Sequence, residues 1–506
     1  MTSEAPRTEF AVWVRQDKKT VLARLAEGVP IQTIAPQADG ALEELVALCV
    51  ELGTFEMLDK LAVKRERAGV SDSLLLHTLA VLPFLAEGSL SGSAKALFAD
   101  PAVLVQLGYA PVQVQQGVTA RHRSPNDKTD QSVPIHPDTL RDELARLSED
   151  DWWTLQRERL TVLYTRRLIR SQRVVVDGSG LGPGERVVVL SALTGEGLVP
   201  LVWLYLTGDA SEKGREATVT RKLIELVREV GGPEAIKLFL ADALYADGPL
   251  LTWLKSVGID ALVRLPEDRL LWQEAQSILK LQAEGQAEGQ ESQQWVKHRQ
   301  TRVLNGKKEQ RTVEVASASQ LTDWDSYVAK AKELGLAESG LWVGAVRQLE
   351  PKLPADKELT VLVSTKQWAN AWEGYQAYRP RWWQENAGFN ELKEGWLLER
   401  FPWGRDEAIV RSRVGFTLLA QQEVALYRQA AGRQLAGYGI RRLRQALRYA
   451  LGGPGVVVVV ENSYAVLNVE ELMAALGHPV IESLRCILPA SSPASSESRR
   501  GVVRQC

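Results

Sequence analysis

Cysteine, histidine and long apolar runs are scarce in this chain. Its 506 residues include three cysteines, Cys49, Cys486 and Cys506, with no Cys-x-x-Cys pair, which argues against a disulfide framework and a zinc ribbon. The five histidines have no metal-ligand spacing. No uninterrupted apolar run is long enough to span a bilayer, and the N-terminus lacks an apolar signal core. We therefore expect a cytoplasmic protein without a membrane partner.

An excess of charge of one sign is also lacking. The chain has 61 Lys and Arg against 63 Asp and Glu, for a formal net charge of −2. This balance neither indicates nor excludes nucleic-acid binding, because that affinity follows local basic patches. The 25% charged and 45% hydrophobic content is ordinary for a globular protein, and the length predicts two or three domains.

Three acidic residues occupy informative places. Asp177 ends the apolar run QRVVVD, and Asp242 ends IKLFLAD, so both are expected at strand ends. The stretch YRPRWWQENAGFNELKEGW is expected to be helical from near Pro380. In it Tyr378, Arg381 and Glu385 lie three and four residues apart and share a helical face. Two strand-end aspartates and a helical glutamate form the carboxylate cluster that a two-metal phosphoryl-transfer site requires.

This pattern resembles the DDE transposases of the bacterial insertion-sequence class, and within them family four, whose third acid lies in a Y-x2-R-x3-E-x6-K signature. Tyr378, Arg381 and Glu385 match the signature in type and spacing. Lys393 follows Glu385 with one residue too many, which turns it by about 100° on an ideal helix. Either Gly388 permits a local bulge that restores the lysine, or Lys393 has a different role.

The resemblance implies a site and a reaction. Asp177, Asp242 and Glu385 would be the catalytic ligands of two Mg²⁺ ions, with Mn²⁺ as a substitute and Asp177 bridging the two. Tyr378, Arg381 and Lys393 would contact DNA, where an arginine fork suits phosphate; alternatively, Arg381 forms an ion pair with Glu385. Water would free a 3′ hydroxyl at the transposon end, and that hydroxyl would attack the opposite strand, giving a hairpin before insertion.

The partners implied are double-stranded DNA, as terminal inverted repeats and target DNA, and a second copy of the chain in a homodimer. The protein would then be associated with the bacterial nucleoid. A basic run in GIRRLRQALRY is equally consistent with DNA-backbone binding and with a solvated helix face.

The fold class expected is α/β with a ribonuclease-H-like core. From residue 172 the chain reads as three strands, helix, strand, helix and strand, and the first two acids lie on the first and fourth strands. We expect a helical N-terminal domain (1–120) for DNA-end binding, a linker and helix (121–171), the core (172–400) with a β-rich insertion (266–357), and a helical C-terminal region (401–506) with a disordered tail.

Three alternatives stay open within this scheme. The segment KKTVLARLAEGVPIQTIA reads as a helix-turn-helix or as one more helical hairpin. A tryptophan of the insertion could stack on a flipped base, although core packing accounts for each of them, and the sequence offers four: Trp272, Trp295, Trp324 and Trp342. Finally, the whole chain could be a catalytically inactive DNA-end-binding protein derived from a transposase, with a host nuclease as a third, weaker possibility.

Overall fold

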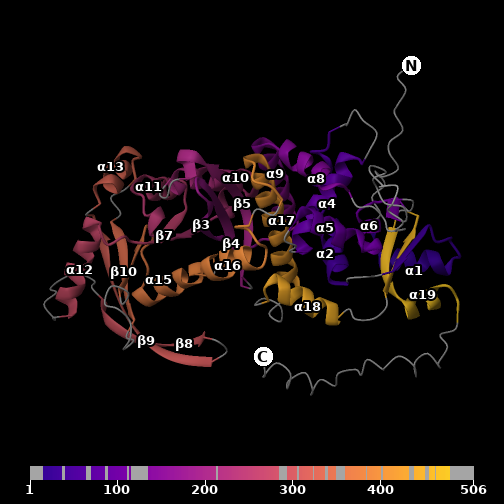
Figure 1. Cartoon of the computed structure of the whole chain (residues 1–506). Coiled ribbons are helices and arrows are strands. Elements are labelled where there is room, and N and C mark those ends of the chain that lie inside the picture. The colour runs from indigo at the N-terminus through magenta and orange to yellow at the C-terminus, as the bar shows by residue number, and fades with distance from the viewer. Residues whose placement is uncertain are drawn as a thin grey trace.

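The computed structural model describes most of the chain between residues 15 and 478. The described ranges are 15–36, 40–63, 70–85, 89–110, 113–114, 135–195, 197–211, 215–283, 293–304, 307–322, 324–336, 340–348, 359–382, 384–400, 403–431, 438–450, 455–461 and 463–478. Most of the expected linker and the expected disordered tail lie outside them. A mixed sheet lies at one end of the molecule and a helical bundle at the other (Figure 1).

The first part of the sheet has the element order that the sequence predicts. The elements are β3 (Arg173–Gly182), β4 (Glu185–Leu193), β5 (Leu198–Thr207), α10 (Glu216–Gly231), β6 (Leu238–Ala241), α11 (Gly248–Ser256) and β7 (Asp260–Arg264). The three first strands form an antiparallel meander, and β3 pairs with β6 in parallel. Because parallel strands need a crossover, α10 and α11 follow β5 and β6 and pack on the sheet.

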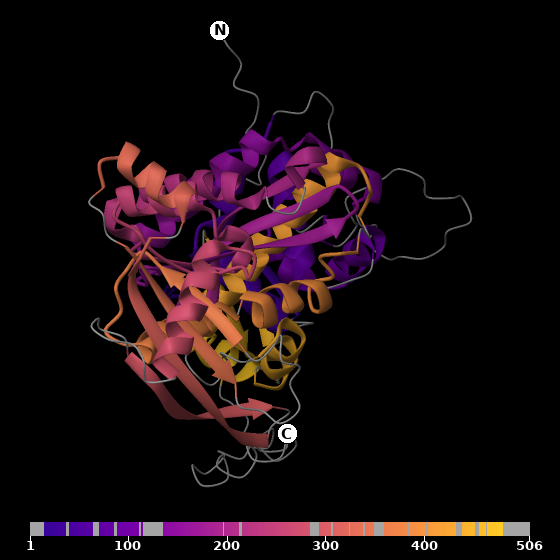
Figure 2. The same cartoon turned by 90° about the vertical axis from the view of Figure 1, so that its left-hand side faces the viewer.

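The expected insertion extends this sheet instead of forming a separate layer. It contains α12 (Leu270–Ala283), β8 (Gln293–Leu304), β9 (Lys307–Leu321), α13 (Asp325–Glu333) and β10 (Leu341–Gln348). Strand β11 (Leu359–Ser364) pairs with both β7 and β10, which gives the strand order β5-β4-β3-β6-β7-β11-β10-β9-β8. The long β8–β9 hairpin forms the curved free edge (Figure 2). Trp324 and Trp342 are buried in the packing around these strands, as core residues.

The two faces of the sheet have different covers. Val174 and Val176 of β3 pack with α10 and α11 in one apolar cluster. Val175 points to the other face, where its cluster includes residues of α15 (Ala371–Tyr378). Since side chains alternate along a strand, Asp177 lies on the same face as Val175, under α15.

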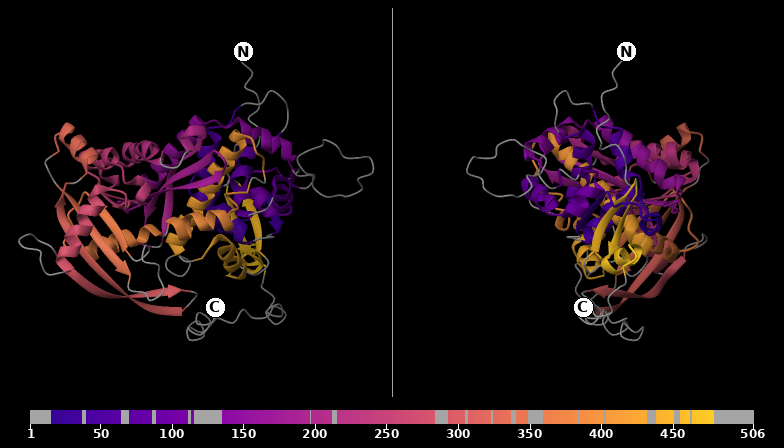
Figure 3. Two further views of the ribbon diagram at one scale, coloured as in Figure 1. Left: turned by 60° about the vertical axis from the view of Figure 1, so that its left-hand side comes forward. Right: turned by 90° about the vertical axis from the view of Figure 1, so that its right-hand side faces the viewer.

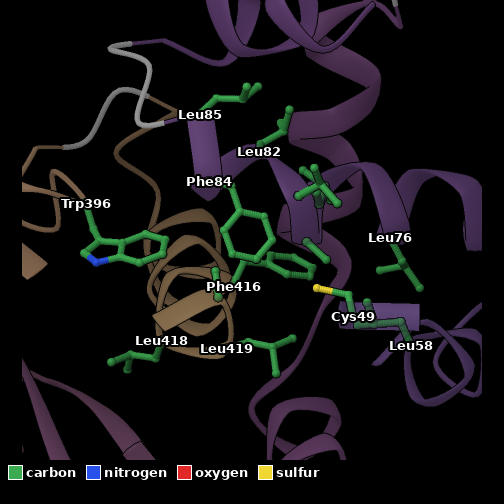
Figure 4. Close-up of a cluster of buried hydrophobic side chains, with 14 of the residues drawn as sticks. Cys49, Leu58, Leu76, Leu82, Phe84, Leu85, Trp396, Phe416, Leu418 and Leu419 are labelled. Carbon is green, nitrogen blue, oxygen red and sulfur yellow. The ribbon is translucent and has the colours of Figure 1, made fainter. Parts of the chain in front are cut away.

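The helical bundle packs around α17 (Glu407–Ala431), which runs through its centre. Its helices from the N-terminal half are α2 (Gly40–Glu51), α3 (Thr54–Asp59), α4 (Asp72–Leu85), α5 (Leu90–Phe98), α6 (Pro101–Gln106), α8 (Pro137–Arg146) and α9 (Glu149–Thr165). Phe416 and Leu419 of α17 lie among Cys49, Leu82 and Phe84 of the N-terminal helices (Figure 4). The sequence pattern predicts one helix where α8 and α9 stand; Ser148 and Asp151 separate them through a capping box.

The two ends of the chain share a second sheet. Its strands are β1 (Arg15–Gln16), β2 (Thr33–Pro36), β12 (Gly455–Val460) and β13 (Ser463–Asn468), in the order β1-β13-β12-β2. Helices α1 (Lys18–Ala26) and α19 (Val469–Ala475) cover one face (Figure 3). Both readings of residues 18–35, the helix-turn-helix and the helical hairpin, are therefore wrong: the second piece is strand β2, paired with β12.

No single helix in the described part of the chain has the length and apolar composition needed to cross a membrane, although α4 and α5, bent by 99° at their junction, would pass that test as a pair.

A buried ion pair joins the bundle to the sheet. Arg159 of α9 and Glu423 of α17 are each 1% exposed, and their side chains meet at 2.8 Å. Glu423 also accepts a hydrogen bond from Thr54, and Arg159 Nε donates to Gln422 at 2.7 Å. Gln422 in turn donates to the carbonyl of Pro200 in β5 at 2.6 Å. The network therefore links α3, α9, α17 and β5.

Breaking this pair should destabilise the whole protein. We expect Arg159→Met to lower the free energy of unfolding by about 3–5 kcal/mol, because it leaves a buried carboxylate without its cation. Arg157 of the same helix is the control: its ion pair with Glu229 is exposed, so Arg157→Met should cost at most about 1 kcal/mol. Urea denaturation measures both. Equal losses in the two variants would contradict the assignment.

The shared terminal sheet predicts a second result. Truncation after Pro454 removes β12 and β13. Strand β1 then loses its partner β13, β2 loses its partner β12, and α1 loses the strands on which it packs. We expect limited proteolysis to cleave residues 15–36 rapidly in this variant. Truncation after His478 keeps the sheet and should leave the N-terminal segment as resistant as in the full chain. Equal resistance in both truncations would show that the two ends are independent.

Candidate active site

The register of β3 against β6 brings two of the predicted acids together. Val174 lies beside Phe239 and Val175 beside Leu240, so two further steps place Asp177 level with Asp242. Adjacent strands are about 4.8 Å apart, and both carboxylates belong to the face that α15 covers. The pair is thus formed by strand pairing alone.

Local hydrogen bonds orient both carboxylates. Asp177 Oδ1 accepts from the backbone N–H of Gly178 at 2.8 Å. Asp242 caps the short 3₁₀ helix η4 (Ala243–Tyr245), and its Oδ1 accepts from the N–H of Leu244 at 2.9 Å. Asp242 thus follows the end of β6, as the sequence predicts, whereas the strand-end prediction is wrong for Asp177, because β3 continues to Gly182 in its pairing with β4.

Tyr378 and Arg381 lie over these acids. Arg381 Nη1 is 3.6 Å from Asp177 Oδ2, and its guanidinium is 6.0 Å from the ring centroid of Tyr378. Arg381 is 6% exposed and Tyr378 is 1% exposed. Burial raises the pKa of Tyr378, Arg381 opposes that rise, and the Asp242 carboxylate adds to it. The phenol therefore stays protonated near neutral pH, as a hydrogen-bond donor.

The helix that carries Glu385 differs from the single regular helix expected from the sequence. It begins at Ala371 rather than near Pro380, continues as the 3₁₀ helix η5 (Arg379–Arg381), and then widens into the π-helix η6 (Gln384–Phe389). Glu385 is in η6, which packs against β3. Its side chain lies outside the described part of the structure, so an Arg381–Glu385 ion pair is not tested.

The π-helix is a local bulge at Gly388, as one of the two alternatives for Lys393 requires. A π-turn takes up about one residue more than an α-turn, which offsets the extra residue between Glu385 and Lys393. Lys393 follows in α16 (Asn390–Glu394), where its ammonium group pairs with Glu399 at 2.6 Å. The observed partner of Lys393 is thus Glu399.

Sequence reasoning did not find Glu216, which is 1% exposed at the start of α10. Its Oε1 is 2.5 Å from Arg186 Nη1, and it would be 2.8 Å from a Cβ placed on Gly178. Burial raises the pKa of Tyr245, and the charges of Glu216, Asp177 and Asp242 raise it further. Glu216, Arg186 and Tyr245 therefore border the aspartate pair on its α10 side.

Arg264, at the end of β7, lies close enough to Tyr378 for its charge to lower the pKa of that phenol, and so borders the site. The sequence signal available for Glu216 was weak, because an acidic residue in a first helical turn is explained by the helix dipole.

The site suits a hard divalent cation as far as it is described. Asp177 and Asp242 offer carboxylate oxygens of the kind Mg²⁺ prefers. Among the described side chains, no group of three or more His, Cys, Asp or Glu residues gathers in a metal-binding arrangement. The third oxygen ligand would have to come from Glu385.

The contact between Gly178 and Glu216 predicts a sharp difference between two glycines of one strand. In Gly178→Ala, the new methyl group meets a carboxylate held by Arg186, so we expect a loss of about 1–3 kcal/mol of unfolding free energy. Gly180→Ala meets nothing within 4 Å and should be close to neutral. Thermal denaturation compares them. A neutral Gly178→Ala variant would show that Glu216 moves freely.

Comparison with known proteins gives a family match over part of the chain. Residues 187–419 match the family model of the transposase DDE domain. The matched range contains Asp242, Tyr378, Arg381 and Glu385, and it begins after Asp177. No curated protein matches the chain. Over these residues, which are less than half of the chain, the protein is similar to the transposase DDE domain.

Proposed function

We propose that the protein is a cut-and-paste DNA transposase that cleaves transposon ends and joins them to target DNA. The observation that carries this proposal is the β3–β6 register, which sets Asp177 level with Asp242 beneath Arg381. The family match supplies the reaction class, since a DDE domain implies nuclease or transposase activity.

The core is proposed to be ribonuclease-H-like. Its support is the order β5-β4-β3-β6-β7, with the first acid on the central strand and the second after the neighbouring parallel strand. Ligands of open α/β sheets bind outside the carboxyl ends of such strands.

Asp177, Asp242 and Glu385 would hold Mg²⁺ or Mn²⁺, with Asp177 shared between two ions. Bound there, the cations would lower the pKa of an attacking water and stabilise the leaving oxygen. The charge of Arg381, now directed at Asp177, would turn to a DNA phosphate, where a guanidinium can form two parallel hydrogen bonds. Tyr378 would remain a neutral donor beside it, because burial and Asp242 raise its pKa.

The finer features of family four belong to the same proposal. They are a hairpin intermediate, a homodimer that holds both DNA ends, and recognition of the inverted repeats by the helices before residue 120. For Lys393, a phosphate contact requires that it leave Glu399, its present partner. The π-helix supports that role, because it offsets the extra residue in the signature.

End cleavage in vitro tests the enzyme. Full-length protein is incubated with duplex DNA carrying the element's own terminus, with Mg²⁺ or Mn²⁺. We expect metal-dependent nicking at the terminus that falls by at least about 100-fold in Asp242→Ala, because one carboxylate ligand is removed. A hairpin band on a denaturing gel would support the family-four pathway.

Glu225→Gln, an exposed carboxylate on α10, is the matched control and should cleave like the wild type. Specific binding to the terminus without cleavage under either metal would favour the alternative function, a catalytically inactive DNA-end-binding protein. Equal cleavage by wild type and Asp242→Ala would reject the assigned site.

A further inference from the structure

A basic groove runs along the surface where α18 (Ile440–Ala450) meets the turn between β4 and β5. A cavity of about 470 Å³ lies between η6, α16, α17 and the start of α18. A second cavity, of about 480 Å³, lies at the start of β3. Thr194 lines both, so both cavities border the β4–β5 turn. We name their combined lining the basic groove.

The groove is strongly positive in a chain that is slightly negative overall. In the part of the lining that the structure describes, six cations face two carboxylates: Arg170, Arg173, Lys237, Arg428, Arg441 and Arg442 against Glu391 and Glu394. Glu391 is already engaged, because Arg428 donates to both its oxygens, at 3.0 and 2.6 Å. Lys237 is paired with Glu234 outside the lining, and Glu394 is the one further carboxylate among the described lining residues, so the charges of Arg170, Arg173, Arg441 and Arg442 exceed those of the lining carboxylates.

The backbone beneath the exposed arginines is fixed. Glu391 Oε1 also accepts from the backbone N–H of Ile440 at 2.9 Å, which ties the start of α18 to α16. Arg441 donates to the carbonyl of Glu394 at 3.0 Å. Arg442 lies 4.2 Å from the ring centroid of Tyr438. Both arginines are exposed, and neither is joined by an ion pair to a carboxylate among the described residues.

The groove reaches the helix that carries the third acid. Gln384 and Gly388 of η6 line the first cavity, and Gln384 directly precedes Glu385. A chain of phosphates leaving the candidate active site along η6 would meet Arg441 and Arg442 next. Among the described lining residues Tyr438 is the one aromatic ring, and Arg442 already covers it, so these residues offer no open platform for stacked bases.

We propose that the basic groove binds the phosphate backbone of double-stranded DNA beside the bond that is cleaved, with Arg441 and Arg442 each contacting a phosphate. This inference rests on the proposed function for the identity of the polyanion. It assigns a role to the α18 arginines that the sequence pattern alone left undecided between a DNA contact and a solvated face. Duplex DNA is favoured over single-stranded DNA because the described lining residues can contact phosphates but provide no free aromatic ring on which unpaired bases could stack.

The test is the salt dependence of binding, measured without divalent metal so that no cleavage is needed. Binding of the full-length protein to a fluorescent duplex of the element's terminus is followed by anisotropy across a salt series. For R441Q/R442Q, we expect the slope of log K against log salt to fall by about 1.8, and the affinity at about 0.1 M salt to fall roughly 60-fold, the counterion-release values for two phosphates.

The control removes the same charge elsewhere: R157Q/R221Q changes two exposed arginines on α9 and α10. It should keep the wild-type slope. An unchanged slope in R441Q/R442Q, an equal fall in both double variants, or no duplex binding by the wild type would overturn the inference. Because binding is measured without metal, this test is independent of cleavage. If the slope falls as predicted in R441Q/R442Q but the wild type never cleaves DNA with metal present, the groove is supported and the enzymatic function is rejected.

A single-stranded probe tests whether the groove binds single-stranded DNA instead of duplex. If R441Q/R442Q loses affinity for the single-stranded probe but not for the duplex, the groove does not bind duplex DNA and the inference fails. Thermal denaturation accompanies every variant. Both arginines are exposed, so their replacement should leave the melting temperature within a few degrees of the wild type.

Discussion

The parallel pairing of β3 with β6 is the interaction on which the candidate site depends. Its register decides that Asp177 and Asp242 stand side by side, and its alternation decides that both face α15. A slip of one residue would turn every side chain of one strand to the opposite face and separate the acids. The register is secured by packing on both faces, since Val174 and Val175 belong to different apolar clusters. The placement of the two acids is therefore a consequence of core packing.

The helical bundle positions the segment that carries Glu385, through contacts that lie outside the candidate site. The Arg159–Glu423 pair ties α9 and α17 together, and Gln422 carries the connection to β5. Burial raises the pKa of Glu423 and Arg159 opposes that rise, which shows that the pair is held against a desolvation cost. From the same helix α17, Arg428 binds Glu391 and so positions α16, just after the π-helix that bears Glu385. One helix thus connects the buried network with the acid-bearing segment.

Much of the core was predictable because its signals are local. The run around Asp177, the run around Asp242 and the helix between them each carry a clear period, and their order is the observed one. The terminal sheet was not, since the two-residue strand β1 and the strand β13 are defined only by pairing between opposite ends of the chain. Glu216 was missed because its neighbours Gly178 and Arg186 come together only in the folded sheet. Pairing between distant segments produces no hydrophobic periodicity within either segment, so a reading of one segment cannot reveal it.

The segment from Tyr378 to Lys393 shows how a departure from a sequence signature can be structural. An ideal α-helix would carry Arg381 and Glu385 on one face and turn Lys393 away. The chain instead passes through α, 3₁₀ and π geometry within a few residues, so spacing counted on a regular helix does not give direction here. Such π-turns occur frequently at functional sites, where they change the direction of the side chains that follow. The wide turn also moves Gln384 and Gly388 into the wall of the basic groove. A single inserted residue can therefore link the third acid of the site to the surface on which its DNA would lie.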